Sequence, residues 1–203
     1  MKKYELTEET VIVSGKTLYR IRAVRDFGSV KAGDLGGYIE KEENLSHCGE
    51  AWVSDNAMVC GYAEVCGYAE VSDDAVVSGN AVVSGNARVC GEALVCDNAE
   101  VYGNAKVSGN AKVSGKACVC GDAEVSDTRH FFVQGPIGSR DGFVTFYRTK
   151  NNTVGVRCGC FSGSLQKFVD RVEETHGGSR YEKEYKLAAE LAKVCIRLEG
   201  ESR

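Results

Sequence analysis

Long apolar stretches and histidine are both scarce in this chain of 203 residues. No apolar run approaches the ~18 residues that cross a bilayer, so we expect no membrane-spanning segment. The first ten residues contain no apolar core of the kind found in secretory signals, and we therefore expect a cytoplasmic protein. Only three histidines are present, and none lies between residues 48 and 129. Sites that need several histidines are therefore excluded from the middle of the chain.

Excess positive charge is also missing. The chain carries 25 basic and 29 acidic residues, which gives a net charge of −4. Proteins that hold nucleic-acid backbones usually present a basic surface, so direct nucleic-acid binding is not expected. The ten cysteines should be mostly reduced in a cytoplasm.

A six-residue phrase repeats thirteen times without insertion between residues 51 and 127. It reads Ala-x-Val-(Ser/Cys/Tyr)-(Gly/Asp)-x, as in AVVSGN at 75–80. Alanine and valine lie two apart, so both point to the same side of a strand, and the Gly/Asp position tolerates the positive φ of a tight turn. This fixed short period predicts a three-sided parallel β-helix with about 18 residues per turn.

The phrase resembles that of the hexapeptide-repeat superfamily, in which an aliphatic residue is followed four places later by a small one. Here these pairs run from Val53 with Ala57 to Val119 with Ala123. The resemblance implies a left-handed β-helix, an exception to the usual right-handed crossover. We interpret residues 45–50 as a degenerate fourteenth phrase in which His47 replaces the valine, and expect about four to five coils.

The two ends of the repeat differ in composition from it. Residues 1–44 are predicted as a β-rich cap, with strands at 10–13 and 17–27 joined by a turn at 14–16. Residues 129–203 are predicted as an α+β domain, with strands at 131–133, 143–147 and 153–157 and helices at 165–176 and 180–198. The fold class is therefore mainly β: a β-helix over 45–128 whose open ends are both covered.

Five cysteines occupy the slot that serine takes in sister phrases: Cys60, Cys66, Cys90, Cys96 and Cys120. We interpret them as small outward-facing fillers. Cys48 and Cys66 are 18 residues apart and would lie on adjacent coils, so a disulfide between them is the alternative to free thiols.

No catalytic residue is expected. Acyltransferases of the superfamily place a general-base histidine near the acceptor, and His47, His130 and His176 match no such position. Their coils are usually interrupted by a substrate loop, which this repeat lacks. The zinc enzymes of the superfamily need three histidines for each metal, and Cys158 with Cys160 is too small a set for a metal site. We therefore expect neither metal nor cofactor, and acyltransferase activity stays an alternative.

Two glycine-rich segments of the C-terminal domain suggest a phosphate-binding pocket. Backbone N–H groups in such turns form anion-binding concavities, and a guanidinium suits phosphate or carboxylate. The alternative is a simple hairpin loop and an ordinary capped helix start. The candidate residues are Gly135, Gly138, Ser139 and Arg140 in the first segment, and Arg157, Ser162, Gly163 and Ser164 in the second.

Residues 18 apart should stack on the outer faces of the prism. Met58, Val76 and Leu94 then form an apolar ladder, and apolar strips of this kind usually mark an interface. We expect a homo-oligomer, trimer or dimer, that uses this face. The alternative is that the C-terminal helices fold back onto it.

Segments 34–40, 135–140 and 158–161, together with the uninterrupted phrases, resemble phage- and prophage-encoded hexapeptide-repeat proteins that are labelled transferases or polymer-forming proteins. The resemblance implies a viral accessory protein in the cytoplasm of a bacterial host. Because fold does not give function, our interpretation rests on the absent catalytic residues. We interpret the protein as a non-enzymatic binding module. It would capture either a host protein, as an inhibitor of antiviral defence, or a phosphorylated, nucleotide-like ligand. A self-assembling scaffold is the third option.

Overall fold

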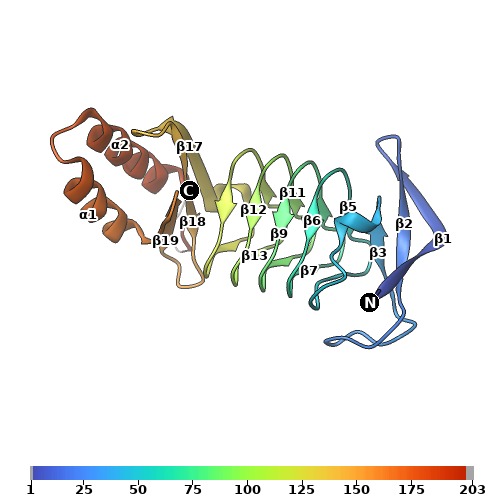
Figure 1. Cartoon of the computed structure of the whole chain (residues 1–203). Coiled ribbons are helices and arrows are strands. Elements are labelled where there is room, and N and C mark those ends of the chain that lie inside the picture. Colours follow the sequence, from blue (N-terminus) through green and yellow to red (C-terminus); the bar gives the residue numbers. More distant parts are fainter. Residues whose placement is uncertain (1, 200–203) are drawn as a thin grey trace.

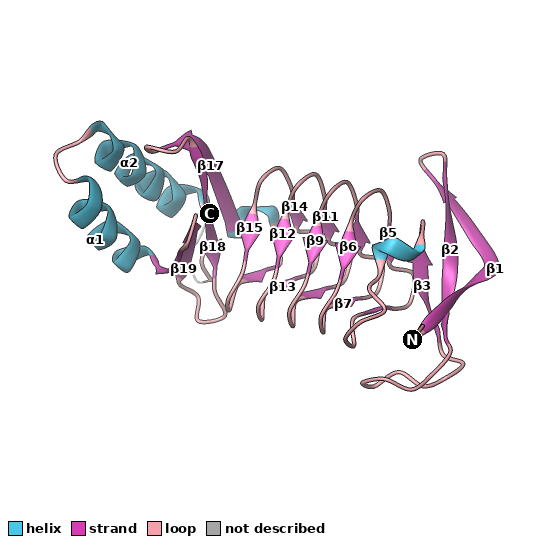
Figure 2. Cartoon of the chain, in the orientation of Figure 1, coloured by secondary structure: helices cyan, strands magenta, loops and turns pink. Residues whose placement is uncertain are grey.

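The chain is a β-solenoid with a folded unit at each end (Figure 1). The computed structural model describes residues 2–199. Helices α1 (Leu165–His176) and α2 (Arg180–Cys195) both lie in the C-terminal unit. Elsewhere the helical structure consists of single 3-10 turns at Glu42–Asn44 and Thr128–His130 (Figure 2). Neither α1 nor α2 is long and apolar enough to cross a membrane, and they are the longest helices of the described part.

The solenoid contains one two-residue strand in each phrase, from β4 to β16. The six-residue phrase, with two residues in each corner, predicts strands of about four residues. The strands are shorter because most alanine N–H groups donate to a carbonyl of their own corner and not to the next coil. Ala57 N–H, for example, donates to the Ser54 carbonyl at 3.1 Å. The strands are β4 (Trp52–Val53), β5 (Met58–Val59), β6 (Glu64–Val65), β7 (Glu70–Val71), β8 (Val76–Val77), β9 (Val82–Val83), β10 (Arg88–Val89), β11 (Leu94–Val95), β12 (Glu100–Val101), β13 (Lys106–Val107), β14 (Lys112–Val113), β15 (Cys118–Val119) and β16 (Glu124–Val125).

These strands stack in register 18 residues apart and form the three flat sides of the prism. One side is β16-β13-β10-β7-β4, the second is β15-β12-β9-β6, and the third is β5-β8-β11-β14 within a larger sheet. Every repeat alanine and valine is at most 2 % exposed, so each coil adds six small apolar side chains to one continuous interior. The predicted parallel β-helix is confirmed.

Aspartate takes the place of glycine at three of the corners. Asp55, Asp73 and Asp97 adopt positive φ, between 56° and 61°, a region that costs most residues about 1–2 kcal/mol. The side chains offset part of this cost. The Asp73 carboxylate accepts the N–H of Gly91 at 2.8 Å, and the Asp97 carboxylate accepts that of Gly115 at 2.9 Å. Each aspartate thereby ties its corner to the corner one coil later.

The N-terminal unit extends one side of the prism as a sheet. Strands β1 (Tyr4–Val13) and β2 (Lys16–Ala23) form the predicted hairpin, and β3 (Leu35–Ile39) continues in parallel onto β5. Ile39 pairs with Val59 and Leu45 with Val65, an offset of 20 residues instead of 18. The repeat geometry therefore begins before residue 45.

The interpretation that His47 takes the valine position is wrong. Leu45, which is fully buried, occupies it. The coil then has two extra residues before Ala51, and these release His47 from the interior. Its ring stacks on Tyr4 with centroids 4.4 Å apart.

The C-terminal unit is an antiparallel sheet with the two helices packed on it. The three predicted strands are confirmed as β17 (Phe131–Ile137), β18 (Gly142–Arg148) and β19 (Val154–Cys158). A fourth strand, β20 (Phe161–Ser164), was not predicted because its serine and glycine residues disfavour strands. Helix α2 ends at Cys195, three residues earlier than expected.

This sheet closes the last coil. Arg148 is only 6 % exposed, and its guanidinium donates to the Glu124 carbonyl at 3.1 Å and to the Ser126 hydroxyl at 3.3 Å. The Thr145 hydroxyl accepts the N–H of Cys118 at 2.9 Å. These bonds satisfy backbone groups that an open solenoid end would expose.

Two corner glycines provide a direct test of the stacking. A Cβ on Gly85 would lie 2.9 Å from the Gly103 nitrogen, whereas a Cβ on Gly115 meets nothing within 4 Å. Both residues have positive φ, so both alanine variants carry the same conformational cost. We expect Gly85→Ala to lower the free energy of unfolding by about 1–3 kcal/mol more than Gly115→Ala. Equal losses in chemical denaturation would contradict corner-on-corner packing.

Candidate functional site

A cavity of about 610 Å³ opens in the C-terminal unit between the sheet and the two helices. Its lining includes the apolar residues Phe161, Phe168 and Val172, which we call its floor, and the two arginines Arg140 and Arg171. This size lies within the ~300–1,000 Å³ range typical of small-molecule sites. The remaining lining residues are Ser139, Gly142, Phe143, Cys158, Gly159, Cys160, Thr175, His176 and Tyr185.

Packed aromatic rings hold the floor of this C-terminal cavity in place. Phe168 stands edge-on to Tyr185, with centroids 5.7 Å apart, and contacts Phe161 at 5.6 Å. His176 lies beside Tyr185 at 5.7 Å. The cavity is therefore built on side chains fixed by α1, α2 and β20, and it presents aromatic faces to a ligand.

Two polar side chains of the cavity, Tyr185 and Cys158, keep their protons at neutral pH. Burial raises the pKa of Tyr185 to about 12, and the neighbouring Cys158 acts in the same direction, so the phenol keeps its proton. Burial also raises the pKa of the Cys158 thiol. Arg171 pairs with Glu174 at 3.1 Å, but both side chains are about two-thirds exposed. Such surface pairs are weak, so Arg171 is free to turn to a ligand.

The structure brings part of the predicted phosphate site together. Ser139 and Arg140 from the first segment lie in the same cavity as residues 158–161, which precede the rest of the second segment. The Gly138 N–H does not face an open anion site, because it donates to the Glu184 carboxylate at 2.7 Å. Gly135 packs against Phe143, and a Cβ at this position would lie 2.5 Å from a carbon of that ring, so glycine is needed here for steric reasons.

The other predicted residues lie outside this cavity. Ser164 caps α1 by accepting the Lys167 N–H, and Gly163 contacts the Phe161 ring. Ser162 and Arg157 face the junction with the solenoid. There the Ser162 hydroxyl lies 4.0 Å from the buried Cys120 sulfur. The Arg157 guanidinium lies 5.9 Å from the centre of the Tyr102 ring.

Sequence reasoning missed all six lining residues from the helices, four of which carry polar groups. Arg171, Thr175 and His176 come from the last two turns of α1, and Tyr185 from α2. Arg171 and Thr175 are four apart, which places them on one helix face. Nothing in the sequence reveals that this face borders the loop carrying Arg140.

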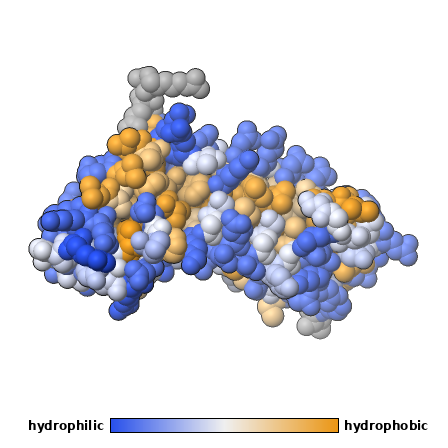
Figure 3. Space-filling view, turned by 90° about the horizontal axis from the view of Figure 1, so that it is seen from above, coloured by the Kyte–Doolittle hydropathy of each residue, from blue (hydrophilic) through white to orange (hydrophobic). Residues whose placement is uncertain are grey.

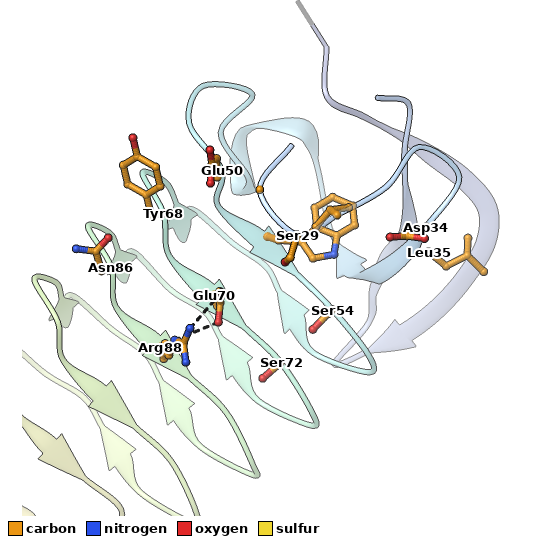
Figure 4. Close-up of a pocket in the computed structure, with 13 residues that line it drawn as sticks. Ser29, Asp34, Leu35, Glu50, Ser54, Tyr68, Glu70, Ser72, Asn86 and Arg88 are labelled. Atoms are coloured by element: carbon orange, nitrogen blue, oxygen red, sulfur yellow. Dashed lines mark hydrogen bonds and ion pairs between the residues drawn. The ribbon is translucent and has the colours of Figure 1, made fainter. Parts of the chain in front are cut away.

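A second cavity, of about 620 Å³, lies on the β4-β7-β10 side of the prism beneath the loop between β2 and β3 (Figure 4). We call it the prism groove. The Glu70–Arg88 ion pair, 3.2 Å between Nε and Oε2, crosses its floor. Its lining residues are Gly28, Ser29, Val30, Asp34, Leu35, Glu50, Trp52, Ser54, Tyr68, Glu70, Ser72, Asn86 and Arg88.

The apolar ladder predicted on the prism is present. Met58 pairs with Val76, and Val76 with Leu94, and all three are half-buried. The C-terminal helices pack on their own sheet at the end of the prism and leave this ladder uncovered (Figure 1).

A second apolar strip is more exposed, on helix α2. Leu187 is 70 % exposed and Val194 82 %, with Leu191 between them. Their spacing of four and three residues is typical of a stripe that faces the core, but the helix instead buries Ala188, Ala189 and Ala192. Figure 3 shows apolar side chains gathered over the C-terminal unit on the face seen from above.

The three histidines lie in separate parts of the fold. His47 is at the N-terminal cap, His130 accepts the Ser126 N–H at 3.1 Å near the end of the solenoid, and His176 lines the C-terminal cavity. Within residues 2–199, no three His, Cys, Asp or Glu side chains are grouped closely enough to hold a metal ion. All ten cysteines are free thiols, Cys48 and Cys66 included.

Comparison with known proteins supports the repeat alone. The family model described as YdcK Beta solenoid repeat matches residues 69–85. This segment covers β7 (Glu70–Val71), β8 and β9 in the middle of the prism. No curated protein sequence matches the chain. The similarity therefore concerns the solenoid, and neither cavity inherits a function from it.

A glycine beside the C-terminal cavity tests how tightly it is built. A Cβ on Gly138 would lie 2.0 Å from the Tyr185 hydroxyl, whereas one on Gly142 meets nothing within 4 Å. We expect Gly138→Ala to lower the free energy of unfolding by about 2–4 kcal/mol, through steric overlap and a positive φ. Gly142→Ala should stay within about 0.5 kcal/mol of the wild type. A stable Gly138→Ala protein with an unchanged near-UV circular dichroism spectrum would contradict this packing.

Proposed function

We propose that the protein is a non-enzymatic binding module whose C-terminal cavity holds a small anionic ligand with a flat apolar body, as a nucleotide has. The observation that carries this proposal is the pairing of Arg140 and Arg171 with a floor of Phe161, Phe168 and Val172 in one cavity. A guanidinium binds phosphate through two parallel hydrogen bonds, and an aromatic floor offers a stacking surface.

The charges around the cavity favour an anion. The Glu184 carboxylate is occupied, because it accepts the Gly138 N–H and pairs with Arg180 at 3.5 Å, and the Glu174 carboxylate pairs with Arg171 at the surface. The Tyr185 phenol keeps its proton and adds no negative charge to the cavity. An incoming phosphate thus meets donors, whereas a cationic ligand would meet two arginines.

The solenoid fits the role of a rigid support. Its coils have no inserted loop between residues 51 and 127, and its interior is closed. The resemblance to phage- and prophage-encoded proteins supports a site of action in the cytoplasm of a bacterial host. A module that holds a nucleotide without consuming it would withdraw a defence signal from that host.

The proposal is tested by ligand-induced melting shifts with AMP and with inorganic phosphate alone as probes. A ligand at 100 times its Kd stabilises the folded state by about 2.7 kcal/mol, which corresponds to roughly 5–10 °C for a chain of this size. Arg140→Ala should weaken AMP binding roughly 10- to 150-fold, the loss of a charged hydrogen bond of about 1.5–3 kcal/mol. Arg129→Ala, an exposed arginine outside the cavity, is the matched control.

Two exposed cysteines give a second readout. Cys160 lines the cavity, whereas Cys48 is exposed at the opposite end of the chain. Bound AMP should slow iodoacetamide labelling of Cys160 and leave Cys48 unchanged. AMP binding that is equal in wild type and Arg140→Ala, without protection of Cys160, would refute the assignment of the cavity.

We propose in addition that the module assembles through the ladder of Met58, Val76 and Leu94. An uncovered apolar strip on the flat side of a prism supports a contact between copies. Leu94→Glu should then convert an oligomer to a monomer by light scattering at constant folded content. Leu191→Glu, which places the same charge on the apolar strip of α2, is the comparison variant. If only that variant dissociates, or if Leu94→Glu keeps its mass, the ladder is not the contact.

A further inference from the structure

The prism groove has features of a ligand site that the C-terminal cavity does not share. Its wall is the loop between β2 and β3, which is held by reciprocal backbone bonds between Phe27 and Val30 at 3.1 and 2.9 Å. The Asp26 carboxylate accepts the Ala32 N–H at 2.9 Å and further braces the loop. The groove is therefore preformed by a rigid loop over a rigid face, as ligand sites usually are.

Trp52 supplies a buried donor at the base of the groove. It is 8 % exposed, and its ring is fixed edge-on against Phe27 with centroids 5.4 Å apart. Its backbone N–H bonds the Ala69 carbonyl at 2.9 Å, and its side chain lines the groove. Among residues 2–199, the solvent-excluded side-chain N and O atoms without a partner belong to Arg20, Arg25 and His47, so the indole N–H is not one of them. As part of the lining of the groove, the indole N–H can donate to a ligand that accepts a hydrogen bond.

The remaining lining groups mix acceptors and donors. Asp34, Glu50 and Glu70 supply carboxylates, and Arg88 and Asn86 supply N–H groups. Three carboxylates against one guanidinium repel an anion, so the ligand differs from that of the C-terminal cavity. The carboxylates also fail to converge into a metal site within the described residues.

Hydroxyl groups match this mixture, because each one donates to a carboxylate and accepts from an N–H. Tyr68 and Leu35 stand at opposite ends of the groove, and Ser54 and Ser72 lie along one side (Figure 4). Tyr68 is 59 % exposed, and its ring is free to lie against the apolar face of a sugar. From these observations we infer that the prism groove binds an uncharged saccharide, with Tyr68 as the stacking platform and Trp52 as the buried donor.

The chain contains a matched control for Tyr68. Tyr62 occupies the same place in the preceding phrase and is 77 % exposed, but it lies on another corner, where Lys41 sits 4.5 Å from its ring centre. Trp52 is the sole tryptophan of the chain, so its fluorescence reports occupancy of the groove directly.

The test is a fluorescence titration of the full chain with maltotriose, cellotriose and chitotriose, and with spermidine as a cationic probe. We expect at least one trisaccharide to change Trp52 emission with a Kd below about 10 mM. Tyr68→Ala should weaken that binding about tenfold, and Tyr62→Ala by less than twofold. Both tyrosines are exposed, so both variants should fold.

Three results would overturn the inference: no response to any trisaccharide, equal effects of the two tyrosine variants, or a response to spermidine in preference to sugars. AMP should not change Trp52 emission, because its proposed site lies at the other end of the prism. The outcome here is therefore independent of the outcome for the C-terminal cavity.

Discussion

The fit of alanine and valine inside a narrow prism is the constraint on which the rest of the structure depends. Between residues 51 and 127 each coil contributes three of each, all buried, without a change of phase. Burial of one methylene contributes about 0.8 kcal/mol, so the repeated valines supply most of the apolar stabilisation of the rod. The corners must then repeat every six residues, and glycine or aspartate with positive φ marks most of them.

This constraint explains why the sequence predicts the solenoid so well. The period alone places residues 18 apart on one ladder, and all three outer ladders follow that rule, including Met58, Val76 and Leu94. Prediction failed where the period breaks. Two extra residues after Leu45 shift the register to 20, and a hexapeptide count cannot reveal which residue then turns inward.

The C-terminal unit was less predictable because its contacts are not periodic. Leu187, Leu191 and Val194 recur in α2 at a spacing that is typical of a stripe facing the core. The helix buries alanines instead, since small side chains allow it to approach the sheet closely. Likewise, Arg140 was recognised by its glycine-rich loop, whereas Arg171 joins it only through the tertiary packing of α1.

The two cavities lie at opposite ends of the rod and differ in charge. The C-terminal cavity combines arginines with aromatic rings, and the prism groove combines carboxylates with a buried indole donor. The backbone of the prism is committed to its own hydrogen bonds, because its strand N–H groups pair with the next coil and most alanine N–H groups bond within their own corners. Specificity therefore depends on the side chains that the end units and the outer ladders contribute.

The most direct measurement of the central claim is an experimental structure of the protein crystallised with AMP. Our account places the phosphate within hydrogen-bonding distance of the Arg140 or Arg171 guanidinium and the adenine against Phe161 or Phe168. Density for AMP in the prism groove, or a C-terminal cavity that stays empty at saturating AMP, would contradict it.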